Sequence, residues 1–147
     1  MSSSPRVTNS GAPVLQAVKL FLEWEIPVKV LRLYWVGTRT AQHAATVEFF
    51  RDVLGLPIRH SEQDFAVLAV PDGSTVEIFG PASPYNRHLT SPAAGFLVDD
   101  LTEEAQELRD RGVEIVLPPQ EGETGGWLHF RAPDGFIYEL SQEWASS

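Results

Sequence analysis

Two stretches of the chain decide its fold: "AVPDGSTVEIF" from Ala69 to Phe79 and "RAPDGFIYELS" from Arg131 to Ser141. Each contains a Pro-Asp-Gly turn, and each places a glutamate four residues after the glycine. A turn followed by an alternating strand is common in β-hairpins, so this likeness alone does not distinguish coincidence from duplication. The sequence around the two stretches decides between them.

Further landmarks recur in the same order in both halves of the chain. The separations stay between 57 and 62 residues for Arg51-Asp52 and Arg109-Asp110, Gly55 and Gly112, and the two Pro-Asp-Gly turns with Glu77 and Glu139. Several landmarks with nearly one period indicate an internal duplication of one supersecondary unit. The Pro-Asp-Gly motif with its glutamate therefore occurs twice because the supersecondary unit is duplicated.

Each copy predicts a strand, a helix and then further strands. In the first copy "VLRLYWVGTRT" is rich in β-branched and aromatic residues, and "AATVEFFRDVLGL" follows as a helix that ends at Gly55. Its apolar face is predicted to comprise Val47, Phe50, Val53 and Leu54. The strands "DFAVLAV" and "TVEIFGP" then flank the first Pro-Asp-Gly turn.

The second copy repeats that order. The strand "AAGFLVDD" leads into a helix whose start is marked by Asp100 and Glu103 as a capping box and whose end is marked by Gly112. The segments "VEIVLPP", "WLHFRAP" and "FIYELSQ" alternate as strands do. We therefore expect an α+β fold of tandem βαβββ modules, over residues 30–82 and 91–147, joined by a linker at 83–90.

The N-terminal residues 1–29 are expected to add a tail and an extra packing element. The first residues are rich in Ser, Pro and Gly, and a helical apolar stripe follows at Val14, Leu15, Val18, Phe21 and Leu22. Charged residues interrupt this stripe well short of the ~20 residues that a membrane-spanning helix needs. The segment therefore predicts packing and no membrane anchor.

Composition narrows the range of partners. The 147 residues include no cysteine, which removes disulfides, thiolate metal sites and cysteine nucleophiles and suits a reducing, cytoplasmic location. The formal net charge of −9 disfavours nucleic acid and anionic membrane surfaces. The same charge would attract a cationic small molecule.

The duplicated unit, with "FFRDVLGL" in the first copy and "LRDRGVEIV" and "FRAPDGFIYEL" in the second, resembles the vicinal oxygen chelate superfamily. This superfamily includes glyoxalase I, bleomycin-resistance proteins and extradiol dioxygenases, and the resemblance covers about residues 30 to 142. It implies mixed sheets that curl around a cleft, a small-molecule ligand and a homodimer. Because the superfamily supports several chemistries on one scaffold, the resemblance does not by itself select a function.

The resemblance also implies where metal ligands would stand. The two histidine positions of metal-using relatives fall on Trp35 and Ala93, and their glutamate positions fall on Glu77 and Glu139. Since both histidines are missing, we expect a degenerate metal site and no resident cofactor. The alternative is a divalent metal ion held by Glu77, Glu139 and His129.

His129 is expected to share a strand face with Glu139, as a structural histidine, a metal ligand or a general base. The candidate catalytic residues are therefore Glu139, His129 and Glu77. The candidate ligand-binding residues are the aromatic and cationic side chains of Trp35, Arg39, Trp127, Arg131 and Tyr85. His88 falls in the linker, and His43 and His60 look peripheral.

Three functions fit these residues. The first is a metal-free binding protein of the bleomycin-resistance kind, which sequesters a cationic or planar compound. The second is a glyoxalase-like lyase or isomerase with a metal between its glutamates. The third is a structural or regulatory module that catalyses nothing. The missing histidines favour the first function over the second.

Overall fold

A computed structural model describes residues 28–145 of the chain. The predicted apolar stripe at residues 14–22 lies outside the described residues. The elements follow the order β1 (Val30–Arg39), α2 (His43–Glu48), η1 (Phe49–Val53), β2 (Ile58–Glu62), β3 (Phe65–Ala69), β4 (Thr75–Phe79), β5 (Ala93–Val98), α3 (Leu101–Asp110), β6 (Ile115–Glu121), β7 (Gly125–Arg131) and β8 (Ile137–Glu143).

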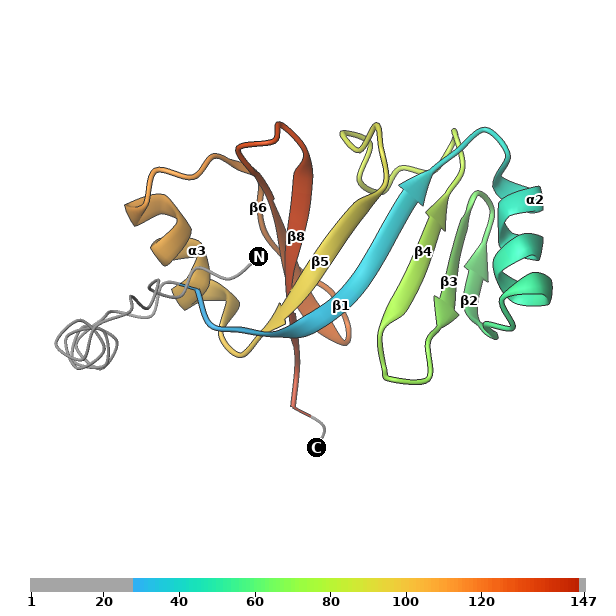
Figure 1. The fold of residues 1–147 in the computed structure, drawn as a ribbon, viewed down its shortest axis with the longest axis horizontal. Coiled ribbons are helices and arrows are strands. Elements are labelled where there is room, and N and C mark those ends of the chain that lie inside the picture. Colours follow the sequence, from blue (N-terminus) through green and yellow to red (C-terminus); the bar gives the residue numbers. More distant parts are fainter. Residues whose placement is uncertain (1–27, 146–147) are drawn as a thin grey trace, which may run out of the picture.

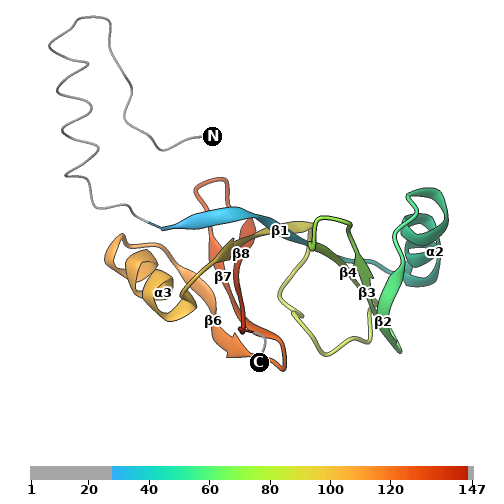
Figure 2. The ribbon, with the colours of Figure 1, turned by 90° about the horizontal axis from the view of Figure 1, so that it is seen from below.

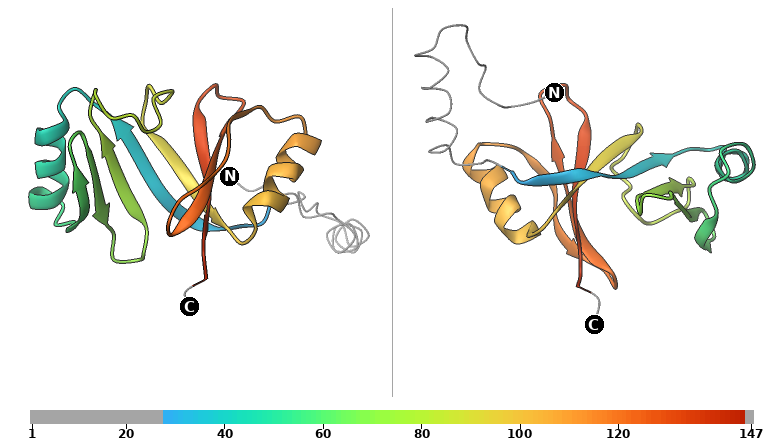
Figure 3. Two further views of the ribbon diagram at one scale, coloured as in Figure 1. Left: turned by 180° about the vertical axis from the view of Figure 1, so that it is seen from behind. Right: turned by 60° about the horizontal axis from the view of Figure 1, so that its bottom comes forward.

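The strands form one mixed eight-stranded sheet in the order β2-β3-β4-β1-β5-β8-β7-β6. β1 pairs in parallel with β4, β5 pairs in parallel with β8, and the antiparallel pairing of β1 with β5 joins the two halves. Figure 1 shows the strongly twisted sheet with α2 at one end and α3 at the other, and the same arrangement is seen from behind in Figure 3. The open sheet confirms the expected α+β fold.

The two Pro-Asp-Gly turns have the same hydrogen bonds. Asp72 accepts a bond from the amide of Ser74 at 2.9 Å, and Asp134 accepts one from the amide of Phe136 at 2.9 Å. Gly73 has a φ of 93° and Gly135 a φ of 85°, a left-handed backbone that favours glycine. The repeated sequence motif therefore forms the same turn in both halves of the chain.

Each half has its own apolar core beside its helix. In the second half, Asp100 caps α3 by accepting a bond from the amide of Glu103, as the sequence predicts. The buried face of α3 packs on β5, β7 and β8, in a cluster formed by Val98, Leu101, Ala105, Leu108, Leu128 and Leu140. The corresponding cluster of the first half is formed by Val47, Ala66, Leu68, Val76 and Ile78.

The predicted apolar face of the first helix is wrong in its last turn. The chain is α-helical only to Glu48 and then widens into the π-helical η1. Because a π turn holds more residues than an α turn, side chains after it leave the 3.6-residue stripe. Val53 is 68 % exposed and Leu54 is 52 % exposed, whereas Val47 is buried as predicted.

Among the described residues, no helix has the length and apolar character required to cross a bilayer.

The core of the second half gives a stability prediction. Leu128 is fully buried between α3 and the sheet. Leu128→Ala leaves a cavity there and should lower the free energy of unfolding by about 2–5 kcal/mol in urea titration. Leu31→Ala, at a side chain that is 52 % exposed, is the matched control and should change it by less than about 0.5 kcal/mol. Equal losses in both variants would contradict this account of the core.

Candidate functional site

A cavity of about 580 Å³ lies between the two halves of the sheet. Strands of both halves and the segment 84–88 contribute to its lining, whose side chains are mainly aromatic, carboxylic and cationic. Figure 2 shows the segment 84–88 within a loop that lies beside the sheet, between the two halves. The cavity is thus a place where the two halves can act on the same molecule.

Two glutamates face this cavity from equivalent strand positions. Glu77 on β4 lies opposite Gly37 of β1, and Glu139 on β8 lies opposite Gly95 of β5. A shift of one residue in either pairing would turn one of these side chains to the other face of the sheet. The register therefore confirms the predicted equivalence of Glu77 and Glu139.

The glycines opposite the glutamates leave room for large neighbours. A Cβ atom at Gly37 would lie 2.1 Å from the indole ring of Trp35, so this ring lies directly over Gly37. A Cβ atom at Gly95 would lie 2.9 Å from the Cβ atom of Glu139. The absence of side chains at these two positions brings Trp35 and Glu139 close to the sheet surface.

Burial changes the acidity of Glu77. Desolvation and the nearby charge of Glu139 raise the pKa of Glu77 to about 7, while the Trp35 side chain and Arg59 act in the opposite direction. The carboxyl group remains partly accessible from the cavity. Near neutral pH, Glu77 therefore exists in both its acidic and its basic form.

Glu139 is more deeply enclosed and is held by two side chains. Its Oε1 atom lies 2.8 Å from Nε2 of His129, and its Oε2 atom accepts a bond from Ser141 at 2.5 Å. Desolvation raises the pKa of Glu139 to about 8, against the effect of the Ser141 hydroxyl. Burial also lowers the pKa of His129 to about 4, so the pair is predominantly uncharged at neutral pH.

His129 connects Glu139 to the segment between the two halves. It is fully buried behind Glu139, and its ring stacks at 6.0 Å from the ring of Trp35. Its Nδ1 atom lies 2.6 Å from Nε2 of His88, which is half-buried and lines the cavity. The predicted pairing of His129 with Glu139 is present, and His88 extends it.

Three of the five predicted ligand-binding residues line the cavity: Trp35, Trp127 and Tyr85. Arg39 does not line it, because its guanidinium group donates to the carbonyls of Gly80, Ser83 and Tyr85 and so anchors the segment that carries His88. Arg131 lies at the exposed end of β7, where it bonds to Glu114 and to the carbonyl of Gly135. The expectation that these two arginines contact a ligand therefore does not fit their positions.

Other residues of the site were not predicted. Ser141 stands two residues after Glu139 and so shares its face, a signal that strand alternation could have supplied. His88, Arg59 and Arg87 reach the cavity from β2 and the segment 84–88. No sequence pattern shows where those segments fold back, so these residues could not be assigned.

The residues present do not fit a resident transition metal. The two positions where histidine ligands would stand carry an indole, whose nitrogen has no lone pair to give, and the methyl group of Ala93. Both ring nitrogens of His129 already face Glu139 and His88. Within residues 28–145, no three His, Asp or Glu side chains are grouped to hold a metal ion.

Comparisons with known proteins agree with this fold. Biphenyl-2,3-diol 1,2-dioxygenase 3 of Rhodococcus globerulus is 30 % identical over 118 residues, which are 74 % of this chain and 62 % of that enzyme. The chain thus spans less than two thirds of the length of this relative. Methylmalonyl-CoA epimerase of Mycobacterium tuberculosis is similar with a TM-score of 0.64 and 25 % identity, covering 80 % of this chain and 91 % of that one.

A Streptomyces coelicolor methylmalonyl-CoA epimerase in complex with 2-nitronate-propionyl-CoA shares the fold, with a TM-score of 0.63, 22 % identity and coverage of 80 % of this chain and 100 % of that one. A family model described as Glyoxalase/Bleomycin resistance protein/Dioxygenase superfamily matches residues 32–140, which contain both glutamates and the cavity between the halves. The chain therefore belongs to the glyoxalase/bleomycin resistance protein/dioxygenase superfamily.

Proposed function

We propose that this protein is a glyoxalase-like isomerase or lyase that moves a proton on a carbon atom next to a carbonyl group. The observation that carries the proposal is the pair of carboxyl groups, Glu77 and Glu139, that face one cavity with pKa values of about 7 and 8. Acid–base catalysis is most efficient when the pKa of the group lies near the working pH. Two such carboxyls in one cavity supply a base and an acid together.

The two carboxyls have different roles in this reaction. Glu77 has the lower pKa and the greater access to the cavity, so it is the base that removes the proton from the substrate carbon. Glu139 has the higher pKa and is held by His129 and Ser141, so it is the acid that returns a proton. After one turnover Glu77 holds a proton and Glu139 has lost one, and exchange with solvent restores both.

Aromatic walls support this chemistry by excluding water. The cavity lining includes the rings of Tyr34, Trp35, Phe65, Phe79, Tyr85 and Trp127. A bound molecule that covers these rings leaves the two carboxyls in a medium of low polarity, where they retain their raised pKa values. The walls also position a substrate of limited size between the two carboxyls.

Two arginines favour an anionic substrate. Arg59 and Arg87 line the cavity, and both are exposed. A carboxylate or phosphate is the group that a guanidinium binds best. We therefore infer an anionic acyl compound in place of the cationic ligand expected from the net charge. The likeness to methylmalonyl-CoA epimerase supports this class of substrate.

The sequestering function favoured by the sequence has less support. It requires aromatic walls, which the cavity has, but no carboxyls poised near neutral pH. The relatives with stated activities, an epimerase and a dioxygenase, are enzymes. A protein that only sequesters or organises would gain nothing from burying two acids at a cost in stability.

Glu77→Gln tests the proposed function. The amide keeps the shape of the carboxyl and cannot remove a proton, so kcat for exchange should fall by about 100- to 10,000-fold with little change in KM. The assay is proton NMR of methylmalonyl-CoA in D₂O, followed by further acyl thioesters and 2-oxo acids, with exchange of the hydrogen beside the carbonyl as the readout.

Glu121→Gln, at an exposed glutamate of β6, is the control and should exchange substrate as the unchanged protein does. Exchange that persists at full rate in Glu77→Gln would contradict the proposal. So would the absence of exchange with every substrate of the panel, above all if the protein instead cleaves biphenyl-2,3-diol in the presence of iron(II) and oxygen.

The residues at the ligand positions give a prediction about metal content. Protein purified without chelator should contain far less than one equivalent of zinc, nickel, iron or manganese per chain by elemental analysis, because two carboxylates without imidazole bind these ions weakly. A full equivalent that is lost in Glu139→Gln would instead show that the site is rebuilt around Glu139.

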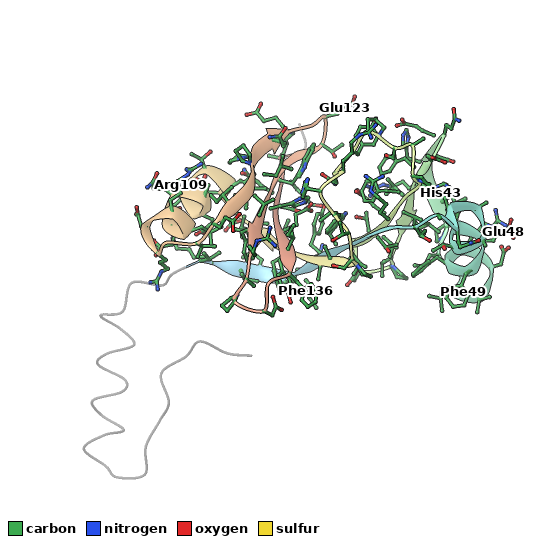
Figure 4. All side chains as sticks on the ribbon, turned by 90° about the horizontal axis from the view of Figure 1, so that it is seen from above. His43, Glu48, Phe49, Arg109, Glu123 and Phe136 are labelled. Atoms are coloured by element: carbon green, nitrogen blue, oxygen red, sulfur yellow. The ribbon has the colours of Figure 1, made fainter. Side chains whose placement is uncertain are left out.

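We further propose that the protein is a homodimer. All of the edge strand β2 is exposed, and large apolar side chains are exposed at one end of the molecule: Phe49, Val53, Leu54 and Ile58. Figure 4 shows Phe49 at the periphery beside Glu48, far from Arg109 on α3. Open edges and apolar surface of this kind favour pairing of two copies. Sedimentation equilibrium at micromolar concentration should give the mass of two chains, and the mass of one chain would contradict the proposal.

A further inference from the structure

We propose that His88 and His129 form a proton wire that connects the carboxyl group of Glu139 to solvent, with Nδ1 of His88 as its outer end. The proposal rests on the proposed function, because it explains how Glu139 recovers the proton that it gives to the substrate. His88 and His129 would then be positioning and relay residues that do not touch the substrate's reacting carbon.

The geometry supplies an unbroken chain of contacts. Oε1 of Glu139 lies 2.8 Å from Nε2 of His129, and Nδ1 of His129 lies 2.6 Å from Nε2 of His88. Both distances are those of hydrogen bonds. Each ring thus uses one nitrogen towards Glu139 and the other away from it, which is the arrangement that proton transfer along imidazoles requires.

The proton wire has two forms that differ by one proton. When Glu139 is protonated, it donates to Nε2 of His129, Nδ1 of His129 donates to Nε2 of His88, and the remaining hydrogen of His88 is on Nδ1. When Glu139 is ionised, Nε2 of His129 donates to the carboxylate, and Nε2 of His88 donates to Nδ1 of His129. Conversion of the first form into the second shifts one proton along each bond and releases one proton from Nδ1 of His88.

The wire matters because a substrate that fills the cavity closes the direct route for protons between Glu139 and water. Glu139 is 5 % exposed, and it lines the cavity that a bound substrate would occupy. His129 is 0 % exposed, so it cannot exchange protons with water by itself. His88 also lines the cavity, but it is half-buried on the segment between the two halves and is the most exposed member of the wire. Arg39 holds that segment in place through its three backbone carbonyls.

The surroundings keep both rings uncharged. Desolvation lowers the pKa of His129 to about 4, and desolvation together with His129 and Arg39 lowers the pKa of His88. The titratable and charged groups near the proton wire are Glu77 on β4 and Arg39 on β1. Ser141 donates a hydrogen bond to the other oxygen of Glu139. Uncharged imidazoles can both donate and accept, whereas imidazolium can only donate.

The test is nitrogen NMR of the intact protein with ¹⁵N-labelled histidine, titrated from about pH 6 to pH 10, a range centred on the pKa of about 8 of Glu139. The raised pKa means that Glu139 is protonated below its midpoint and ionised above it. With rising pH, the hydrogen of His129 should therefore move from Nδ1 to Nε2, and that of His88 should make the same move at the same midpoint.

Two variants separate a wire from a purely structural contact. Glu139→Gln removes the titrating group and should abolish the switch of both histidines, including His88, which does not touch Glu139. His129→Gln removes the middle of the wire and should abolish the switch of His88, the histidine of the wire that remains. His60, whose ring contacts Glu62 at 2.6 Å on the exposed strand β2, is the internal control, and its nitrogen signals should be the same in the unchanged protein and in both variants.

The wire is overturned if His88 keeps one tautomer throughout the titration of the unchanged protein, or if its switch survives in Glu139→Gln. Should His129→Gln fail to fold, the isosteric Glu139→Gln still decides the question. These measurements use no substrate, so they test the wire independently of catalysis. If the wire is absent, Glu77 and Glu139 can still exchange the substrate hydrogen. Conversely, a protein without exchange activity can still show the coupled switch.

Discussion

The enclosure of the Glu139 carboxyl by His129 and Ser141 is the constraint on which the site depends. A carboxyl that is 5 % exposed survives in a folded protein only if it is hydrogen-bonded or uncharged, and here both conditions hold. The same burial raises its pKa to about 8, which makes it an acid at neutral pH. The parallel pairing of β5 with β8 places it there, because it sets Glu139 over Gly95.

The duplication makes this arrangement possible. One parallel pair of strands, β1 with β4, presents Glu77 beside the indole of Trp35, and its copy, β5 with β8, presents Glu139 beside His129. The copies have diverged in what surrounds the carboxyl, so the two acids differ in pKa and in access to the cavity. A symmetric scaffold thereby acquires two carboxyls with different tasks.

Most of the fold and the centre of the site follow from sequence patterns. The Pro-Asp-Gly turns join β3 to β4 and β7 to β8, and in these antiparallel pairs Glu77 lies opposite Val67 and Glu139 lies opposite His129, which are equivalent positions. Alternation along β7 placed His129 beside Glu139. Strand period cannot reveal the path of the segment 84–88, and this is why His88 was assigned to a linker. Nor can helical period anticipate the π turn that exposes Val53.

The protonation of the two carboxyls tests the proposed acid and base most directly, and carbon NMR measures it in the resting protein labelled at the glutamate side-chain carboxyl. Resonances assigned by Glu77→Gln and Glu139→Gln should titrate with midpoints near pH 7 and pH 8, well above those of exposed glutamates. If both carboxyls titrate near pH 4.5 like the exposed ones, they are ordinary carboxylates at neutral pH, and the assignment of an acid and a base to this cavity is wrong.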